Sequence, residues 1–181
     1  MIVKIWRARK EVYKYMSDED YAKSAKREND VANEIRKLSG DKIKPKFAGY
    51  GAGVSKKFVT RTAGANTPLD LEVENAFIEV MGSEKYTFLN SNFFPVALDK
   101  VQRAEQSQKP TYFVFVLDNE QQPNKWWIKA EKCKNYPLKY DFPTIYGLQD
   151  IYVTDQNVWI RGLQSLVNEL IRLRINSELN P

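Results

Sequence analysis

The stretch "TPLDLEVENAFIEVMGSE" (residues 67–84) decides the fold, because it reads as two strands joined by a tight turn. Apolar side chains alternate with polar or aromatic ones on both sides of Glu74 and Asn75, which is the period of half-buried strands. If these two residues form the loop, the opposite pairs follow by counting back from it: Val73 with Ala76, Glu72 with Phe77, Leu71 with Ile78, and Asp70 with Glu79. Two carboxylates then lie side by side, which weakens a sheet unless something positive lies between them.

Length and composition favour one folded domain over 1–181. Of the 181 residues, 43% are hydrophobic and 13% aromatic, which is enough for a sizeable core. No stretch has the length of a membrane span, and the start "MIVKIWRARKEVYKYM" is too charged for a signal peptide. The single cysteine, Cys133, excludes an internal disulfide framework. We therefore expect a cytoplasmic protein that does not enter a membrane.

The chain contains no histidine, and this excludes several kinds of chemistry. A catalytic triad that needs histidine, a histidine general base and a histidine-ligated zinc site are all impossible. One cysteine cannot build a zinc site within one chain either. Any metal ion must be held by oxygen atoms, as magnesium, manganese or calcium is.

A long helix is predicted over 18–39, from the possible N-cap Ser17 to the stop at Gly40. Its apolar stripe includes Val31 and Ile35, and Glu28 falls on the same stripe. Either Glu28 lies at a wet edge of this stripe, or it belongs to a site shared with the acidic hairpin.

The rest of the chain predicts a mixed sheet with helices packed on it. The first expected elements are strands at 2–6, near 46–50 and near 57–62, and a helix beginning near Pro95. A buried strand at 111–117, a further strand at 124–133, mostly irregular chain over 134–156 and a terminal helix over 157–175 follow.

This order of elements resembles the restriction-endonuclease-like superfamily of PD-(D/E)XK nucleases. Within it the chain is most similar to small RecB-like and Holliday-junction-resolvase-like enzymes, including those of archaeal viruses. Glu28 matches the helix glutamate of the family, Asp70 its aspartate and Glu79 the glutamate of its Glu-x-Lys signature. The likeness spans a core over about 18–132, and a C-terminal helical extension over about 134–181 would follow.

The resemblance implies a metal-dependent nuclease that hydrolyses phosphodiester bonds of DNA, including branched or recombination intermediates. It implies a Mg²⁺ or Mn²⁺ ion held by Asp70, Glu79 and the backbone carbonyl of Val80, with Glu28 reaching the ion directly or through water. Because such relatives are commonly dimers, it also implies a homodimer. A viral origin would place the protein in the cytoplasm of the host.

Two positions depart from the family pattern. The proline, Pro68, is one residue further from Asp70 than usual, and Met81 stands where the family has the lysine of Glu-x-Lys. A thioether can neither polarise water nor offset negative charge. Three explanations remain open: a basic residue from elsewhere replaces the lysine (Lys85 first, then Lys100 or Lys139), metal ions act alone, or the protein binds DNA without cutting it.

The net charge of +5 is compatible with a polyanionic partner. The residues that could follow a phosphate backbone are Lys44, Lys46, Lys56, Lys57 and Arg61. They could equally be solvated strand edges, just as Asp70 and Glu79 could each pair with a lysine or arginine on the surface. A protein whose role is structural, with incidental basic charge, is the third function class.

Overall fold

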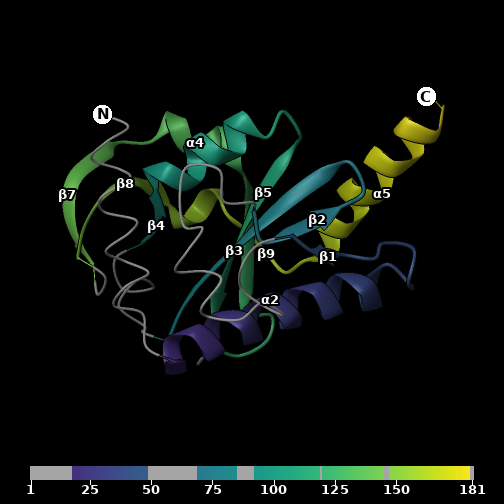
Figure 1. Cartoon of the computed structure of the whole chain (residues 1–181), viewed down its shortest axis with the longest axis horizontal. Helices are drawn as coiled ribbons and strands as arrows, with labels where there is room; N and C mark the ends of the chain where they lie inside the picture. The colour runs from purple at the N-terminus through teal and green to yellow at the C-terminus, as the bar shows by residue number, and fades with distance from the viewer. Residues whose placement is uncertain (1–17, 49–68, 85–91, 119, 145–146, 180–181) are drawn as a thin grey trace.

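The computed structural model describes residues 18–48, 69–84, 92–118, 120–144 and 147–179 (Figure 1). Its helices are α2 (Asp18–Leu38), α4 (Leu98–Gln106) and α5 (Gln164–Leu179), with short 3-10 turns η2 (Ala130–Asn135) and η3 (Gln156–Val158). The strands of the larger sheet are β1 (Lys46–Phe47), β2 (Leu71–Val73), β3 (Ala76–Ser83), β5 (Thr111–Leu117), β6 (Lys125–Lys129) and β9 (Ile160–Arg161). Those of the smaller sheet are β4 (Phe93–Ala97), β7 (Leu138–Thr144) and β8 (Gly147–Asp155).

The larger sheet is mixed, in the order β1-β2-β3-β5-β6-β9. Among the described strands, β3 and β5 alone pair in parallel, and the chain between them passes through β4 and α4. A parallel pair needs such a crossover, because the chain must return to the same end of the sheet. The expected architecture, a mixed sheet flanked by helices with an extra C-terminal helix, is confirmed.

The acidic hairpin has the register that the sequence predicts. Leu71 lies opposite Ile78, Glu72 opposite Phe77, and Val73 opposite Ala76. Glu74 closes the two-residue loop with a φ of +48°, in the left-handed region that tight hairpin turns require. Counting on by one residue brings Asp70, just before β2, opposite Glu79.

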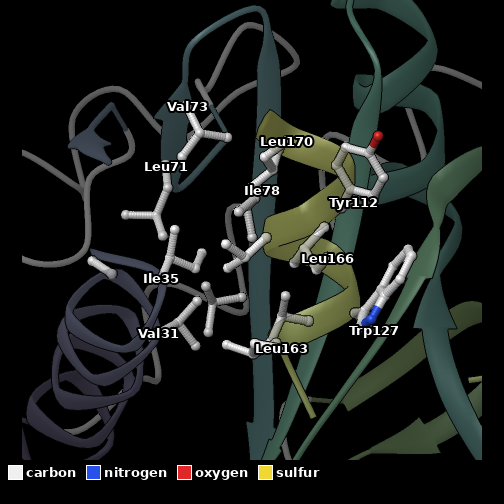
Figure 2. Packing of buried hydrophobic residues seen from close by; sticks show 14 of the residues in the cluster. Val31, Ile35, Leu71, Val73, Ile78, Tyr112, Trp127, Leu163, Leu166 and Leu170 are labelled. Carbon is white, nitrogen blue, oxygen red and sulfur yellow. The ribbon is translucent and has the colours of Figure 1, made fainter. Parts of the chain in front are cut away.

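One face of the larger sheet is covered by α2 and α5 through apolar side chains (Figure 2). Val31 and Ile35 of α2 point toward Ile78, and Leu166 and Leu170 of α5 lie over the same face. All five side chains are fully buried. The predicted stripe of α2 is therefore its core face, and the helix ends at Leu38, before Gly40 with a φ of +58°.

The opposite face of the same sheet packs against α4 and the smaller sheet. Phe113 and Phe115 of β5 belong to this second core together with Phe94 of β4 and Val101 of α4. Phe94 stacks on Phe115 with ring centroids 4.6 Å apart. Successive residues of β5 therefore enter different cores, and all seven residues of the strand are buried, as predicted for a covered strand.

The prediction of a helix beginning near Pro95 was wrong. Pro95 lies in β4, opposite Val153 of β8, and α4 begins only at Leu98. Because β4 is an edge strand of the smaller sheet, a residue without an N–H group is tolerated there.

The prediction of mostly irregular chain over 134–156 was also wrong, because β7 and β8 form an antiparallel pair there. The pairing of these two strands is interrupted by a register shift between Lys139 and Phe142, where Asp141 has a φ of +51°. The terminal helix begins later than predicted, at Gln164, because Ile160 and Arg161 form β9. The expected strands at 2–6 and near 57–62 lie outside the described residues.

Within the described residues, no helix combines the length and the apolar character that a membrane crossing requires.

Candidate active site

Asp70 lies at the mouth of the hairpin and is held by the backbone on both sides. The N–H of Val80 donates a hydrogen bond of 2.8 Å to the Asp70 carboxylate. The carbonyl of Asp70 accepts a hydrogen bond of 3.0 Å from the N–H of Ala48, which follows β1. Asp70 is therefore fixed between the edge strand and the middle of β3.

Three carboxylates from distant parts of the chain influence one another here. Burial raises the pKa of the Asp70 carboxyl well above its usual range, and the charges of Glu79 and Glu28 raise it further. Lys100 and the N–H of Val80 act in the opposite direction. Glu28 on α2 and Glu79 on β3 are themselves buried, with 3% and 1% of their surfaces exposed. The structure thus brings together the three acidic residues that the sequence singled out.

Glu79 is bound by two cations from α4. The Lys100 ammonium donates a hydrogen bond to Oε1 of Glu79, and the Arg103 guanidinium donates another to the same oxygen at 2.9 Å. Arg103 is nearly as deeply buried as Glu79, whereas the Lys100 side chain keeps 26% of its surface exposed. The charge of Glu79 is therefore balanced by protein groups, and one of these groups can still be reached by solvent.

The local sequence explains why both cations point at Glu79. Glu79 lies between Ile78 and Val80, which enter the α2–α5 core, so it projects to the opposite face of β3, where α4 packs. Lys100 and Arg103 are three residues apart on α4, so they lie on one side of the helix, next to the face that buries Val101.

The rim of the site is fixed by an ion pair across the strand ends. Arg27 of α2 donates to the carboxylate of Asp118, after β5, at 3.0 and 3.1 Å. Its side chain passes over Gly82, where an added Cβ would collide with the Arg27 side chain and would lie 2.9 Å from the carbonyl oxygen of Val116. Gly82 therefore allows α2, which carries Glu28, to lie close to the end of β3.

The donor atoms at the site suit a hard cation, although the arrangement is not that of a ready-made metal centre. Carboxylate oxygens are the ligands that magnesium and manganese prefer, and magnesium keeps several waters and needs few protein ligands. Within the described ranges, however, no group of three or more acidic or cysteine side chains is arranged to hold an ion. The chemistry of Asp70, Glu79 and Glu28 fits such an ion, and their side chains would have to close on it.

Other predicted site residues are distributed differently. Lys44, just before the edge strand β1, and Lys46, the first residue of that strand, are both exposed. In the sheet Lys46 lies opposite Glu72, two residues from Asp70. Lys56, Lys57, Arg61 and Lys85 lie outside the described residues. Lys139 is an exposed side chain of β7 in the smaller sheet.

The structure places two residues at the site that had little weight in the prediction from sequence, Lys100 and Arg103. Lys100 was only one of three replacements considered for the missing lysine, and Arg103 was not singled out at all. Their spacing of three residues indicates that both lie on one side of a helix. The sequence, with a helix predicted to begin near Pro95, did not show that this side faces Glu79. Met81 is half-buried and packs against the second core.

No family model and no curated protein matches this chain. Among solved structures, the chain is similar to D212, a nuclease from a fusselovirus, with 14% sequence identity and a TM-score of 0.49. The match covers 80% of this chain and 90% of that one.

Proposed function

We propose that this protein is a metal-dependent nuclease that hydrolyses phosphodiester bonds of DNA, including branched or recombination intermediates. The observation that carries the proposal is the convergence of Glu28, Asp70 and Glu79 from a helix, a loop and a strand. Glu28 and Glu79 are buried and Asp70 is partly buried. Bringing three acidic groups that repel one another into such a place is costly, and this arrangement is typical of functional sites.

Asp70, Glu79 and the carbonyl of Val80 would hold a Mg²⁺ or Mn²⁺ ion, with Glu28 in direct contact or linked through water. Such an ion supplies an activated water and charge neutralisation at the phosphate. The chain itself fixes the direction of Asp70 through the N–H of Val80 and holds Glu79 from α4. The burial of Glu79 and the partial burial of Asp70 strengthen their electrostatic effect.

A basic edge beside the site would position the substrate. Lys44 and Lys46 are exposed at the start of the edge strand β1, and Ala48, which follows this strand, donates its N–H to the backbone carbonyl of Asp70. Together with Lys56, Lys57 and Arg61 they would contact phosphates without reading base sequence. We expect DNA binding that weakens steeply as salt increases.

A second candidate is a DNA-binding protein on the same fold that does not cut. Met81 in the lysine position favours it, and so does Glu79, whose charge is already balanced by Lys100 and Arg103 without an ion. This protein would bind DNA in a salt-dependent way, and divalent ions would neither raise its melting temperature nor cause cleavage.

Cleavage assays separate the two candidates. The purified chain is incubated with plasmid, single-stranded and four-way branched DNA in Mg²⁺ or Mn²⁺, beside Asp70→Asn, Glu79→Gln and the matched variant Glu72→Gln. Glu72 lies on the same hairpin but pairs with Lys109. We expect Asp70→Asn and Glu79→Gln to lose activity on the order of 10³-fold, and Glu72→Gln to keep it. Cleavage that survives both substitutions, or no cleavage by the unchanged chain, rejects the nuclease.

The expected homodimer and the cytoplasmic location, in a host cell if the origin is viral, are part of the same proposal. Light scattering coupled to size-exclusion chromatography tests the dimer, and a monomeric mass at micromolar concentration rejects it.

A further inference from the structure

We propose that Lys100, on α4, supplies the positive charge that the family pattern places at position 81. This inference rests on the proposed nuclease function and names the residue that completes its site. Lys100 lies 21 residues after Glu79 in sequence, yet its ammonium group donates a hydrogen bond to the Glu79 carboxylate.

The geometry of β3 explains how Lys100 can replace a lysine at position 81. Residues 79 and 81 project to the same face of a strand, so a lysine at position 81 would emerge beside Glu79. In this chain that position is Met81, whose side chain packs against the second core. The helix α4 packs on the same face of the sheet and places Lys100 in contact with Glu79.

The position of Lys100 within α4 supplies an independent argument. The helix begins at Leu98, so Lys100 belongs to its first turn, where the partial positive charge of the helix end makes a cation unfavourable. Asp99, in the same turn, is the type of residue that suits this end of a helix, so Lys100 is not placed there to stabilise the helix. A residue that breaks a local rule in this way is expected where function requires it.

The two cations that contact Glu79 differ in how much of their side chains is exposed. Arg103 is 7% exposed and holds the carboxylate from within the core, so it is a positioning residue. Lys100 is 26% exposed, so a phosphate that approaches the three carboxylates can meet its ammonium group. Lysine, with three donors on a flexible stem, can move between Glu79 and a phosphate oxygen.

The other lysine that pairs with the hairpin provides a matched control. Lys109 donates a hydrogen bond of 2.9 Å to Glu72 and lies over the ring of Phe77. It resembles Lys100 in charge, partial exposure and choice of partner, but it serves a glutamate outside the acidic cluster.

The test compares four variants with the unchanged chain: Lys100→Met, Lys109→Met, Met81→Lys, and Lys100→Met combined with Met81→Lys. Cleavage of DNA in Mg²⁺ is measured at several substrate concentrations and pH values. Mn²⁺ binding is measured separately by electron paramagnetic resonance, and circular dichroism checks that each variant is folded.

We expect Lys100→Met to lower kcat on the order of 10²-fold with little change in KM, and Lys109→Met to leave both unchanged. The combined variant should recover at least tenfold of the lost kcat, because its lysine returns to the same face of β3. Mn²⁺ should still bind Lys100→Met, at least as tightly as the unchanged chain, because a competing cation has been removed from Glu79.

Full activity of Lys100→Met, or no recovery in the combined variant while it remains folded, overturns the inference and leaves the nuclease proposal intact. Lost Mn²⁺ binding in folded Lys100→Met also overturns it, because the lysine would then act by shaping the ion site. Absence of cleavage by the unchanged chain rejects the nuclease proposal, and the inference about Lys100 with it.

Discussion

The two faces of strand β3 have opposite characters. On one face Ile78 belongs to a hydrophobic core to which α2 and α5 contribute side chains. On the other, one residue further along, Glu79 is buried with Lys100 and Arg103. Both side chains have almost no exposed surface. Burial alone therefore does not distinguish a hydrophobic core from a candidate site. Apolar packing on the first face stabilises the fold, and this stability allows charged groups to be buried on the second face.

The largest effect is expected from Arg103→Met on the charged face. Removing one partner of a buried ion pair leaves its charge poorly compensated, so we expect the free energy of unfolding to fall by about 3–5 kcal/mol. Urea denaturation measures this loss. The combined variant Arg103→Met with Glu79→Gln should lose less than Arg103→Met alone, because no buried charge remains without its partner. Equal losses in the two variants would show that Arg103 acts through packing and not through charge.

A slightly smaller effect is expected from Leu166→Ala on the apolar face. Leu166 is fully buried between α5 and the sheet, and the cavity left by its truncation should cost about 3 kcal/mol. The matched control is Leu179→Ala, because Leu179 is 72% exposed at the end of the same helix and should change stability by less than about 0.5 kcal/mol. A Leu166 loss that depends on salt or pH would contradict the apolar packing of Leu166 in this core.

Asp70→Asn should be stabilising near neutral pH when no divalent ion is present. Because burial and two neighbouring carboxylates raise the pKa of Asp70 in the folded state, stability is fully present below the ordinary aspartate pKa of about 3.9 and is lost as the pH rises through the folded value. Asparagine has no charge to bury and can still accept the hydrogen bond from Val80.

Thermal denaturation in chelator as a function of pH measures this effect. Asp70→Asn should melt a few degrees above the unchanged chain near neutral pH, and the difference should disappear in acid. Asp150→Asn, on the smaller sheet, is the control for the substitution itself. If Asp70→Asn is less stable at every pH, the three carboxylates do not repel one another in the folded protein.

The smallest effect is expected from Glu169→Gln, on α5 behind the apolar face. Burial acts to raise the pKa of Glu169, but hydrogen bonds from Lys129 and Tyr112 lower it overall. A lowered pKa gives stability that is present above the unfolded value and lost as the pH falls through the folded one. We expect Glu169→Gln to cost less than about 1 kcal/mol near neutral pH and nothing in strong acid. Glu178→Gln, in an exposed pair with Arg174, is the control.

The sequence alone predicted features that repeat over a few residues. Alternation around Glu74 and Asn75 gave the hairpin and its register, and the helical period gave the buried face of α2. The missing histidine excluded whole classes of chemistry without any structure. The acidic residues Glu28, Asp70 and Glu79 were found in the same way, because each stands where its element should be apolar or where like charges meet.

The tertiary structure decided what surrounds those residues. The contacts from Glu79 to Lys100 and Arg103 join positions 21 and 24 residues apart, and the smaller sheet pairs β4 with β8 across most of the C-terminal half. Local periodicity carries no information on such contacts, because they depend on how helices and strands pack once the chain has closed. The sequence alone therefore identifies the acidic residues, and only the tertiary structure shows that Lys100 and Arg103 contact Glu79.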